Sequence, residues 1–343
     1  MTDITRIDRR DLLLGATASS IMSLSPSAFA QTKTLTPITI ANSQGLASQS
    51  LTQMMKNERL YEEFGIDAKV VGVSDGTKIL SGLIGGDVDF AALTGFSQVF
   101  PAVEKGGKVK IIGSGGTLLS VLAMFTGKGN IQSLKDLEGK TIGSGSSGSL
   151  LHQLSIALFK KKGVDHTKVQ FVNIGSSVDV FRAVSAGVVD AGLGDGNNIN
   201  QMEKYKVRLI PGGHLNVDLP EYTLQGAFTT DKAIETKRDA IVRAMAAYGK
   251  LFRMLHSPEG REPFLKAREQ VAKSASREEA ESVWEYLQRY KPYGVNLVIN
   301  EERINYMQQL NVDFGIQKAI LPYDRVTDMS VANDALKLIG GPI

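Results

Sequence analysis

The sequence predicts an α/β protein built mainly of two similar lobes, each with a mostly parallel β-sheet flanked by helices. One observation is a regular alternation. Runs of β-branched residues, such as 38–41 and 68–73, alternate with helical stretches such as 46–64, which Gly65 is expected to end. Strands that alternate with crossover helices form parallel sheets that helices cover on both faces.

The second observation is an internal repeat. When Val71 is laid on Val172, Gly86 falls on Gly187 and Asp89 on Asp190. Both copies consist of a strand, a Gly/Ser loop, a helix and a Gly-x-Val-Asp segment that enters another strand. A repeat on this scale predicts two similar lobes. The alternative is chance matching, since βα units resemble one another anyway.

The remaining elements follow from the same patterns. Further strands are expected at 88–92, 109–112, 140–143 and 169–172, and further helices at 77–84 and 150–161. Residues 222–229 are expected to form a strand that returns to the first lobe. The apolar stripes of the later helices, with Trp284, are expected to be core packing against that lobe. The predicted organisation is an export signal at 1–30, lobe 1 at 31–122 plus 228–343, and lobe 2 at 123–227.

The first thirty residues resemble a bacterial export signal. Arg9-Arg10 precedes a short apolar run, and the small-x-small segment Ala28-Phe29-Ala30 stands just before Gln31. This combination predicts cleavage near Ala30–Gln31 and a periplasmic protein. Asp11 and Leu12 depart from the twin-arginine consensus, so the export route stays open. The alternative is a buried N-terminal helix with chance arginines.

Composition excludes several classes of function. The chain has no Cys, which removes disulfides and thiolate catalysis, and its four His show no zinc-binding spacing. The net charge is +3 with no basic tail, which argues against nucleic acid as a partner. We expect no metal and no cofactor, and we expect a monomer.

The candidate ligand contacts lie in loops after the predicted strands, because ligands of open α/β sheets bind beyond the carboxyl ends of the strands. Most are Ser, Thr, Gly, Asn or Asp, which also cap helices without any ligand. The residues chosen are Ser43, Gln44, Asp75, Gly76, Thr94, Phe96, Ser146, Ser147, Ser176 and Asp195.

The densest of these loops spans residues 144–149. Its glycines allow close approach of a ligand, and its hydroxyls precede a helix N-terminus, which favours a sulfonate, carboxylate or similar oxyanion. Asp75 or Asp195 could pair with an ammonium group, in which case the ligand is zwitterionic, or could be plain helix caps. Phe96, Phe125 and Tyr222 are either apolar walls of the site or core residues.

No catalytic motif stands out. The segment that begins at Gly143 fails the Gly-x-Ser-x-Gly pattern at its last position, and no His has a supporting motif for a serine hydrolase. We therefore expect a protein that is not an enzyme.

Three segments carry a resemblance to a known family: Gly-Gly-Asp-Val-Asp-Phe-Ala-Ala-Leu at 85–93, Leu-Lys-Asp-Leu-Glu-Gly-Lys-Thr-Ile-Gly at 134–143 and Ala-Gly-Val-Val-Asp-Ala-Gly at 186–192. From 37 to 252 the chain resembles the periplasmic solute-binding proteins of ABC importers for nitrate, taurine, alkanesulfonates and thiamine-pyrimidine precursors. The resemblance implies a two-lobed, type II-like periplasmic binding protein fold with a crossing β-hinge. It also implies that the loops at Ser43, Asp75, Thr94, Ser146-Ser147, Ser176 and Asp195 contact ligand.

The function implied by the resemblance is capture of a small organic anion by hinge closure, followed by docking on an ABC permease in the inner membrane. The pyrimidine-synthesising relatives use a cysteine cluster and a lysine-bound cofactor, and the absence of Cys argues against that branch. Two alternatives stay open. One is an exported dehydratase-like enzyme acting on a small cyclic carboxylic acid. The other is a binding protein that supplies a membrane sensor.

Overall fold

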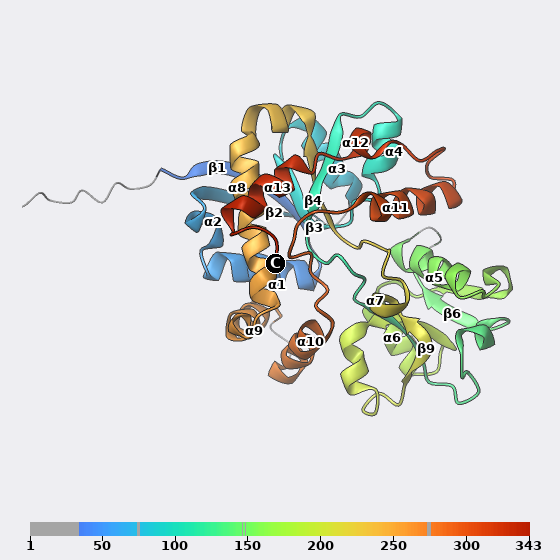
Figure 1. Cartoon of the computed structure of the whole chain (residues 1–343). Coiled ribbons are helices and arrows are strands. Elements are labelled where there is room, and N and C mark those ends of the chain that lie inside the picture. The colour runs from blue at the N-terminus through green and yellow to red at the C-terminus, as the bar shows by residue number, and fades with distance from the viewer. Residues whose placement is uncertain (1–33, 74–75, 146, 148, 273–275) are drawn as a thin grey trace, which may run out of the picture. The chain divides into compact units, whose positions relative to one another are not determined.

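Two five-stranded β-sheets with helices packed on them form the framework of the computed structural model (Figure 1). The structure describes residues 34–73, 76–145, 147, 149–272 and 276–343. The predicted export signal, residues 1–30, lies outside this part of the chain. Residues Leu35–Ile343 form one compact unit.

The two sheets have the same strand order. Sheet 1 consists, in spatial order, of β2 (Ile66–Val73), β1 (Thr36–Ser43), β3 (Phe90–Thr94), β10 (Gly226–Thr230) and β4 (Val109–Ser114). Sheet 2 consists of β7 (Gln170–Asn173), β6 (Thr141–Ser144), β8 (Ala191–Asp195), β5 (Leu122–Thr126) and β9 (Arg208–His214). We call the part of the unit built on sheet 1 lobe 1, and the part built on sheet 2 lobe 2.

Each sheet contains one antiparallel strand that arrives from the other lobe. Strand β5 follows β4 of lobe 1 along the chain, yet it lies between β8 and β9 of sheet 2. Strand β10 follows β9 of lobe 2 and lies between β3 and β4 of sheet 1. The first three strands of each order are parallel. This symmetry confirms the predicted α/β class with two similar lobes and crossing strands.

Helices cover both sheets. Lobe 1 contains α1 (Leu46–Asn57), α2 (Leu60–Glu63), α3 (Gly76–Gly85), α4 (Val99–Glu104) and α8 (Asp231–Leu255). Lobe 2 contains α5 (Leu150–Lys161), α6 (Ser177–Ser185) and α7 (Leu215–Asp218), with 3-10 helices at Leu134–Leu137, His166–Lys168 and Gly196–Gln201. The C-terminal part contains the 3-10 helix Pro258–Gly260, α9 (Arg261–Val271), α10 (Arg277–Tyr290), α11 (Glu301–Asp313), α12 (Tyr323–Val326) and α13 (Ser330–Leu338). No helix of the described chain combines the length and the apolar character needed to cross a membrane.

The stretch predicted as one helix at 46–64 forms two helices, α1 and α2. Arg59 between them takes a left-handed backbone conformation with φ 52°, which interrupts the helical hydrogen bonding. The interruption turns the chain so that Leu60 and Tyr61 are buried, and α2 packs against α8. Burial of these two side chains offsets the cost of the unusual conformation.

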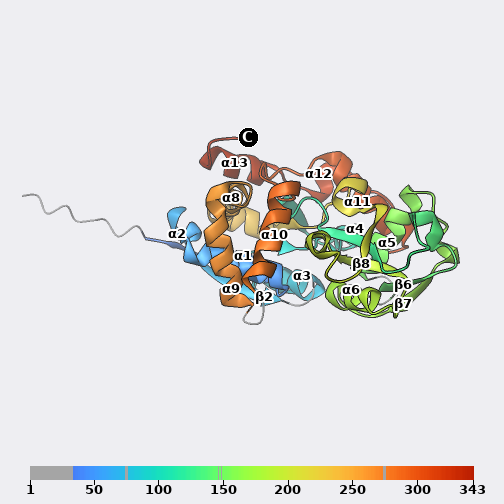
Figure 2. The same cartoon turned by 90° about the horizontal axis from the view of Figure 1, so that it is seen from below.

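Helix α10, which the sequence analysis assigned to the core of lobe 1, contacts both lobes. It packs on α9, which packs on α1 (Figure 2). It also contacts the 3-10 helix Gly196–Gln201 of lobe 2. Ser282 Oγ donates to Asn197 O at 3.2 Å, and Asn200 Nδ2 donates to Ser282 O at 3.1 Å. Trp284 is a core residue, as expected: it is buried and packs on Phe264 with 5.6 Å between ring centroids.

The Gly-x-Val-Asp segments of the repeat have the same structural role in both lobes. Asp89 Oδ2 accepts a hydrogen bond from the backbone N–H of Thr39 at 2.8 Å, and Asp190 Oδ2 accepts one from that of Thr141 at 2.9 Å. Thr39 lies in β1 and Thr141 in β6, the central parallel strand of each sheet. The repeated aspartate therefore joins the strand that it precedes to that central strand.

We expect Asp190→Ala to lower the free energy of unfolding by about 1–3 kcal/mol, since two partly buried donors on Thr141 lose their acceptor. Burial raises the pKa of Asp190, but the hydrogen bonds from Thr141 outweigh it and the net pKa is lowered. The carboxylate therefore adds stability above its unfolded-state pKa, and this is lost as the pH falls through the lower folded value. Urea denaturation at pH 7 and pH 3 tests this. The exposed Asp67→Ala is the control, and an equal loss in both variants would contradict the prediction.

Candidate functional site

A cavity of about 1070 Å³ lies where α1, α6, α9, α10 and the 3-10 helix Gly196–Gln201 meet. Both lobes contribute to its wall, as do Thr117 and Gln225 from the two segments that connect the lobes. A second cavity of about 340 Å³ lies at the N-termini of α5 and α6. The two cavities share Val121, Ser176, Ser177 and Leu224.

The large cavity lies at the carboxyl ends of the strands, as predicted for an α/β protein. Strand β8 ends at Asp195, α6 begins at Ser177, and α1 begins at Leu46, and all three residues line the cavity. The loop glycine Gly45, which follows β1, also lines it. The edge of the sheets that the sequence predicted for ligand binding thus carries a cavity, and ligand binding there stays a prediction.

Two of the predicted contacts, Ser176 and Asp195, line the cavity. Ser176 also caps α6: its Oγ accepts from the Asp179 N–H at 3.2 Å and donates to Asp179 Oδ2 at 2.6 Å. Asp195 stands at the N-cap position of the 3-10 helix, but its side chain makes no capping bond there. It accepts a hydrogen bond from Ser177 Oγ at 2.8 Å instead. Ser176 is thus a helix cap, while Asp195 is not.

Burial raises the pKa of Asp195, although the hydrogen bond from Ser177 and the charge of Arg268 act in the opposite direction. The carboxylate is therefore poorly solvated and lacks a strong partner. A donor on a bound molecule would stabilise its charged form.

Other predicted contacts lie close to the cavity without lining it. Ser43 Oγ accepts from the N–H of the cavity residue Gly45 at 3.2 Å. Gln44 Nε2 donates to Gly72 O at 2.9 Å. Both side chains hold the loop between β1 and α1 in place.

The remaining polar predictions are dispersed. Gly76 begins α3, and its carbonyl lies 3.4 Å from Gln98 Nε2. Thr94 is buried at the end of β3, and Ser147 is exposed in a turn before α5. Asp75 and Ser146 lie outside the described residues.

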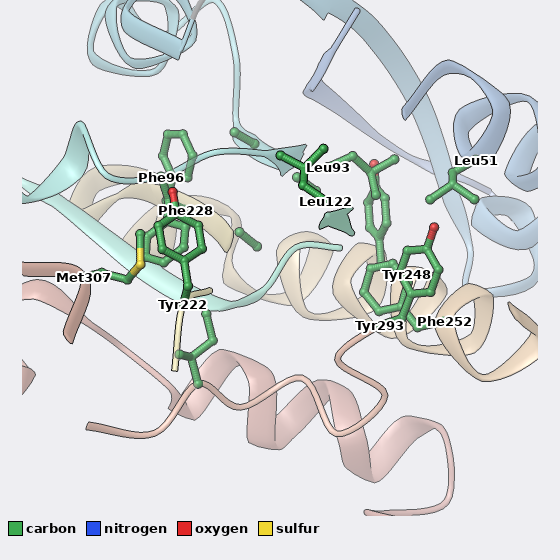
Figure 3. Packing of buried hydrophobic residues seen from close by; sticks show 14 of the residues in the cluster. Leu51, Leu93, Phe96, Leu122, Tyr222, Phe228, Tyr248, Phe252, Tyr293 and Met307 are labelled. Carbon is green, nitrogen blue, oxygen red and sulfur yellow. The ribbon is translucent and has the colours of Figure 1, made fainter. Parts of the chain in front are cut away.

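The three aromatic candidates for an apolar wall are core residues. Phe96 is 1% exposed and packs against Phe100, with 5.7 Å between ring centroids. Phe125 is buried in β5, between β8 and β9, and its ring centroid lies 5.1 Å from that of Phe181. Tyr222 lies beside Phe96 and Phe228 in Figure 3 and is also buried. Phe125 lies in a strand covered on both faces, which carries no alternation that could reveal the direction of its side chain, and Phe96 and Tyr222 lie in loops, which have no periodic pattern.

Several cavity residues of the C-terminal segment escaped the sequence analysis, among them Arg268 on α9, Tyr286 on α10 and Tyr293 after it. The Nε atom of Arg268 is buried and has no hydrogen-bond partner among the described residues. Tyr286 Oη lies 2.9 Å from His214 Nε2, so α10 is linked to lobe 2 at the cavity. The sequence does contain a pattern that could have identified Arg268. The buried residues Phe264 and Ala272 stand four positions before and after it, so Arg268 is a charged residue on an apolar helix face.

The N-terminus of α5 offers further polar groups. Ser149 stands at the N-cap position but makes no capping bond, and its Oγ is buried without a partner in the part of the chain that the structure describes. Ser144 Oγ at the end of β6 is likewise buried and unpartnered. Ser149 lines the smaller cavity. Free hydroxyls at a helix N-terminus are suited to an anionic group.

The lining as a whole suits a bound organic molecule. Apolar side chains such as Leu51, Val121, Leu224 and Leu287 cover much of the large cavity, and the polar groups described above are set between them. Within the described residues, no group of three or more His, Asp or Glu is placed to hold a metal ion.

Comparison with known proteins gives a family and a fold. The family model described as NMT1/THI5 like matches residues 54–258, more than half of the chain. No curated protein matches the chain.

Solved structures of similar fold have low sequence identity. The periplasmic aliphatic sulphonate-binding protein SsuA from Escherichia coli is 16% identical, with a TM-score of 0.69 over 85% of this chain and 92% of that one. The alkanesulfonate-binding protein SsuA from Xanthomonas axonopodis pv. citri, bound to MOPS, is 18% identical, with a TM-score of 0.61 over 86% and 97%. The periplasmic nitrate-binding protein NrtA from Synechocystis PCC 6803 is 10% identical, with a TM-score of 0.62 over 90% of each chain. At this identity they establish the periplasmic binding protein fold.

Proposed function

Since this chain belongs to the NMT1/THI5-like family, we propose that it is the extracytoplasmic solute-binding component of an ABC-type importer. It captures a small organic anion between its lobes and presents it to a permease in the inner membrane. The observation that carries the proposal is the cavity of about 1070 Å³, whose wall both lobes supply. The proposed location is the periplasm, and no bond is made or broken in the cycle.

Capture by closure follows from the positions of the polar groups. A ligand in the cavity can contact Ser48 of α1 in lobe 1 together with Ser177 and Asp195 of lobe 2. Contacts that exist only when the lobes close on the ligand shift the population toward the closed form. The proposed hinges are the two connections between the sheets, β4 to β5 and β9 to β10.

The anionic head has two candidate partners. One is the loop at the α5 N-terminus, with Ser146 and Ser147 as predicted and the free hydroxyls of Ser144 and Ser149 beside it. The other is the guanidinium of Arg268. The size of the cavity favours an organic anion over nitrate, because cavities of several hundred Å³ hold organic molecules. The similarity to sulfonate-binding proteins supports a sulfonate or carboxylate head.

The test is thermal melting of the chain from Gln31 to Ile343 against sulfonates including MOPS, taurine, nitrate, aliphatic and aromatic carboxylates, and pyrimidines. A ligand that binds only the folded state raises the melting temperature, by RT ln(1 + [L]/Kd) in free energy. We expect an organic anion to raise it and to be recovered unchanged. A hit that is recovered chemically altered would show that the protein is an enzyme, and a panel in which only pyrimidines bind would contradict anion capture.

A further inference from the structure

The charged residues that line the large cavity are Arg182, Asp195, Arg268 and Glu279. They divide into two groups, according to whether a partner lies on the residue's own element. Arg182 pairs with Asp179 of its own helix at 3.5 Å, and Glu279 Oε2 accepts from the N–H of Ser276 in the capping box of α10. These two charges already have partners on their own elements. Asp195 and Arg268 are the two remaining charges of the cavity wall.

Neither of these two charges has an ionic partner among the residues that the structure describes. Asp195 accepts from Ser177 Oγ, and no cationic nitrogen lies within 4.0 Å of its carboxylate. Arg268 has no carboxylate oxygen within 4.0 Å, and its Nε is buried without a hydrogen bond. Asp195 approaches the cavity from the end of β8 in lobe 2, whereas Arg268 approaches it from α9. A cavity wall thus presents one unpaired anion and one unpaired cation.

Both charges are unfavourable in this state. Burial raises the pKa of Asp195 and lowers that of Arg268, which means that the charged form of each is poorly solvated. The charges of Asp195 and Glu279 counteract the effect on the pKa of Arg268 only in part. A partly desolvated charge becomes favourable when an opposite charge makes hydrogen bonds to it.

We propose that the captured molecule is a zwitterion, with an acidic group bound by Arg268 and a cationic amine bound by Asp195. This inference rests on the proposed function, because it names the ligand class of the same cavity. A plain anion would leave Asp195 unpaired and place a second negative charge near it. A plain cation would leave Arg268 unpaired. Apolar residues that line the same cavity, such as Val283 and Leu287, would contact the carbon skeleton that joins the two groups.

The experiment uses pairs of probes that differ only in the amine. They are taurine and ethanesulfonate, 4-aminobutyrate and butyrate, and 4-(aminomethyl)benzoate and 4-methylbenzoate, each titrated by calorimetry at pH 7. In at least one pair the amine-bearing member should bind about ten-fold more tightly or better. Asp195→Asn should remove that preference, and Arg268→Gln should weaken both members. Arg261→Gln, on the exposed part of α9, is the matched control and should keep the preference.

The outcomes separate this inference from the proposed function. If plain anions bind as tightly as their amine-bearing partners, or if Asp195→Asn weakens both members equally, the zwitterion is refuted while anion capture stands. If no probe with an acidic group binds, or if a probe is chemically altered, both are refuted.

A second measurement excludes an internal latch in which Asp195 and Arg268 pair with each other. Asp195→Asn, Arg268→Gln and the double variant are unfolded in urea without ligand. For a ligand site, neither single change should lower the unfolding midpoint, and their effects should add. If each single change lowers the midpoint and the double variant restores it, the two residues pair with each other and the zwitterion proposal fails.

Discussion

Replacement of Tyr248 by Ala is expected to lower the free energy of unfolding by about 3–5 kcal/mol, as for other large aromatic residues removed from a core. Tyr248 on α8 is fully buried, and its ring contacts those of Tyr61, Phe90 and Phe252, with centroid distances of 5.9, 6.0 and 6.1 Å. Figure 3 shows it beside Phe252 and Tyr293. The side chain therefore fills the space between α8 and sheet 1, and its loss leaves a cavity.

Tyr248→Phe isolates the contribution of the hydroxyl. Tyr61 Oη donates to Tyr248 Oη at 2.8 Å, and Tyr248 Oη lies 3.0 Å from the side-chain amide of Asn42 at the end of β1. Burial raises the pKa of Tyr248 to about 12, so the phenol stays neutral. We expect a loss of about 1–3 kcal/mol, because the two partners are left unsatisfied. Urea denaturation checks both variants. Tyr290→Phe is the control, and a Tyr248→Phe variant as stable as the wild type would show that the hydroxyl network adds nothing.

Acidification from pH 7 to pH 4.5 is expected to cost the protein up to about 2 kcal/mol through His256 alone, after allowance for its partial exposure. Burial, aided by the charge of Lys291, lowers the pKa of His256 to about 4. Its Nε2 accepts a hydrogen bond from the backbone N–H of Tyr293 at 3.2 Å, which requires the neutral ring. Because the folded pKa lies below the unfolded one, the stability is present above about pH 6.5 and is lost as the pH falls toward 4.

His256→Asn supplies the comparison, since it cannot titrate in this range. The difference in unfolding free energy between wild type and variant, measured by urea denaturation at pH 7 and at pH 4.5, gives the contribution of His256. Burial also lowers the pKa of His214 in lobe 2. His214 is present in both proteins, so its contribution cancels in the difference. A pH-independent difference would contradict the prediction. Since Tyr293 lines the cavity, ligand affinity should also fall in acid in the wild type.

The sequence predicted the lobes better than the site because the two rest on different signals. The strand–helix alternation and the repeated Asp89 and Asp190 depend on local pattern, and the structure has both. The direction of a side chain in a strand buried on both faces leaves no such pattern. Phe125 on β5 could therefore not be assigned to core or wall from the sequence.

The sequence did not predict that the C-terminal helices line the cavity, and the reason is a different one. Helix α9 carries many charged residues, and most of them are exposed or paired, as for Arg261 with Glu281. Arg268 is one more charged residue of this helix and differs from the others only because it lies between Phe264 and Ala272 on the buried face. Which lobe such a helix will contact depends on long-range packing. The sequence pattern of α10 indicates an apolar stripe but not that Ser282 bonds to lobe 2.

The exchange of strands between the sheets sets an order for synthesis of the chain. All five strands of sheet 2 lie within Leu122–His214, so that sheet can be completed as soon as β9 has left the ribosome. In sheet 1, β3 and β4 are separated until β10 enters between them, and β10 ends only at Thr230. The half that is translated first is therefore finished last. Until then it presents two unpaired strand edges, which are open to pairing with other chains. A nascent chain stalled between β9 and β10 should be the most aggregation-prone intermediate in the life of this protein.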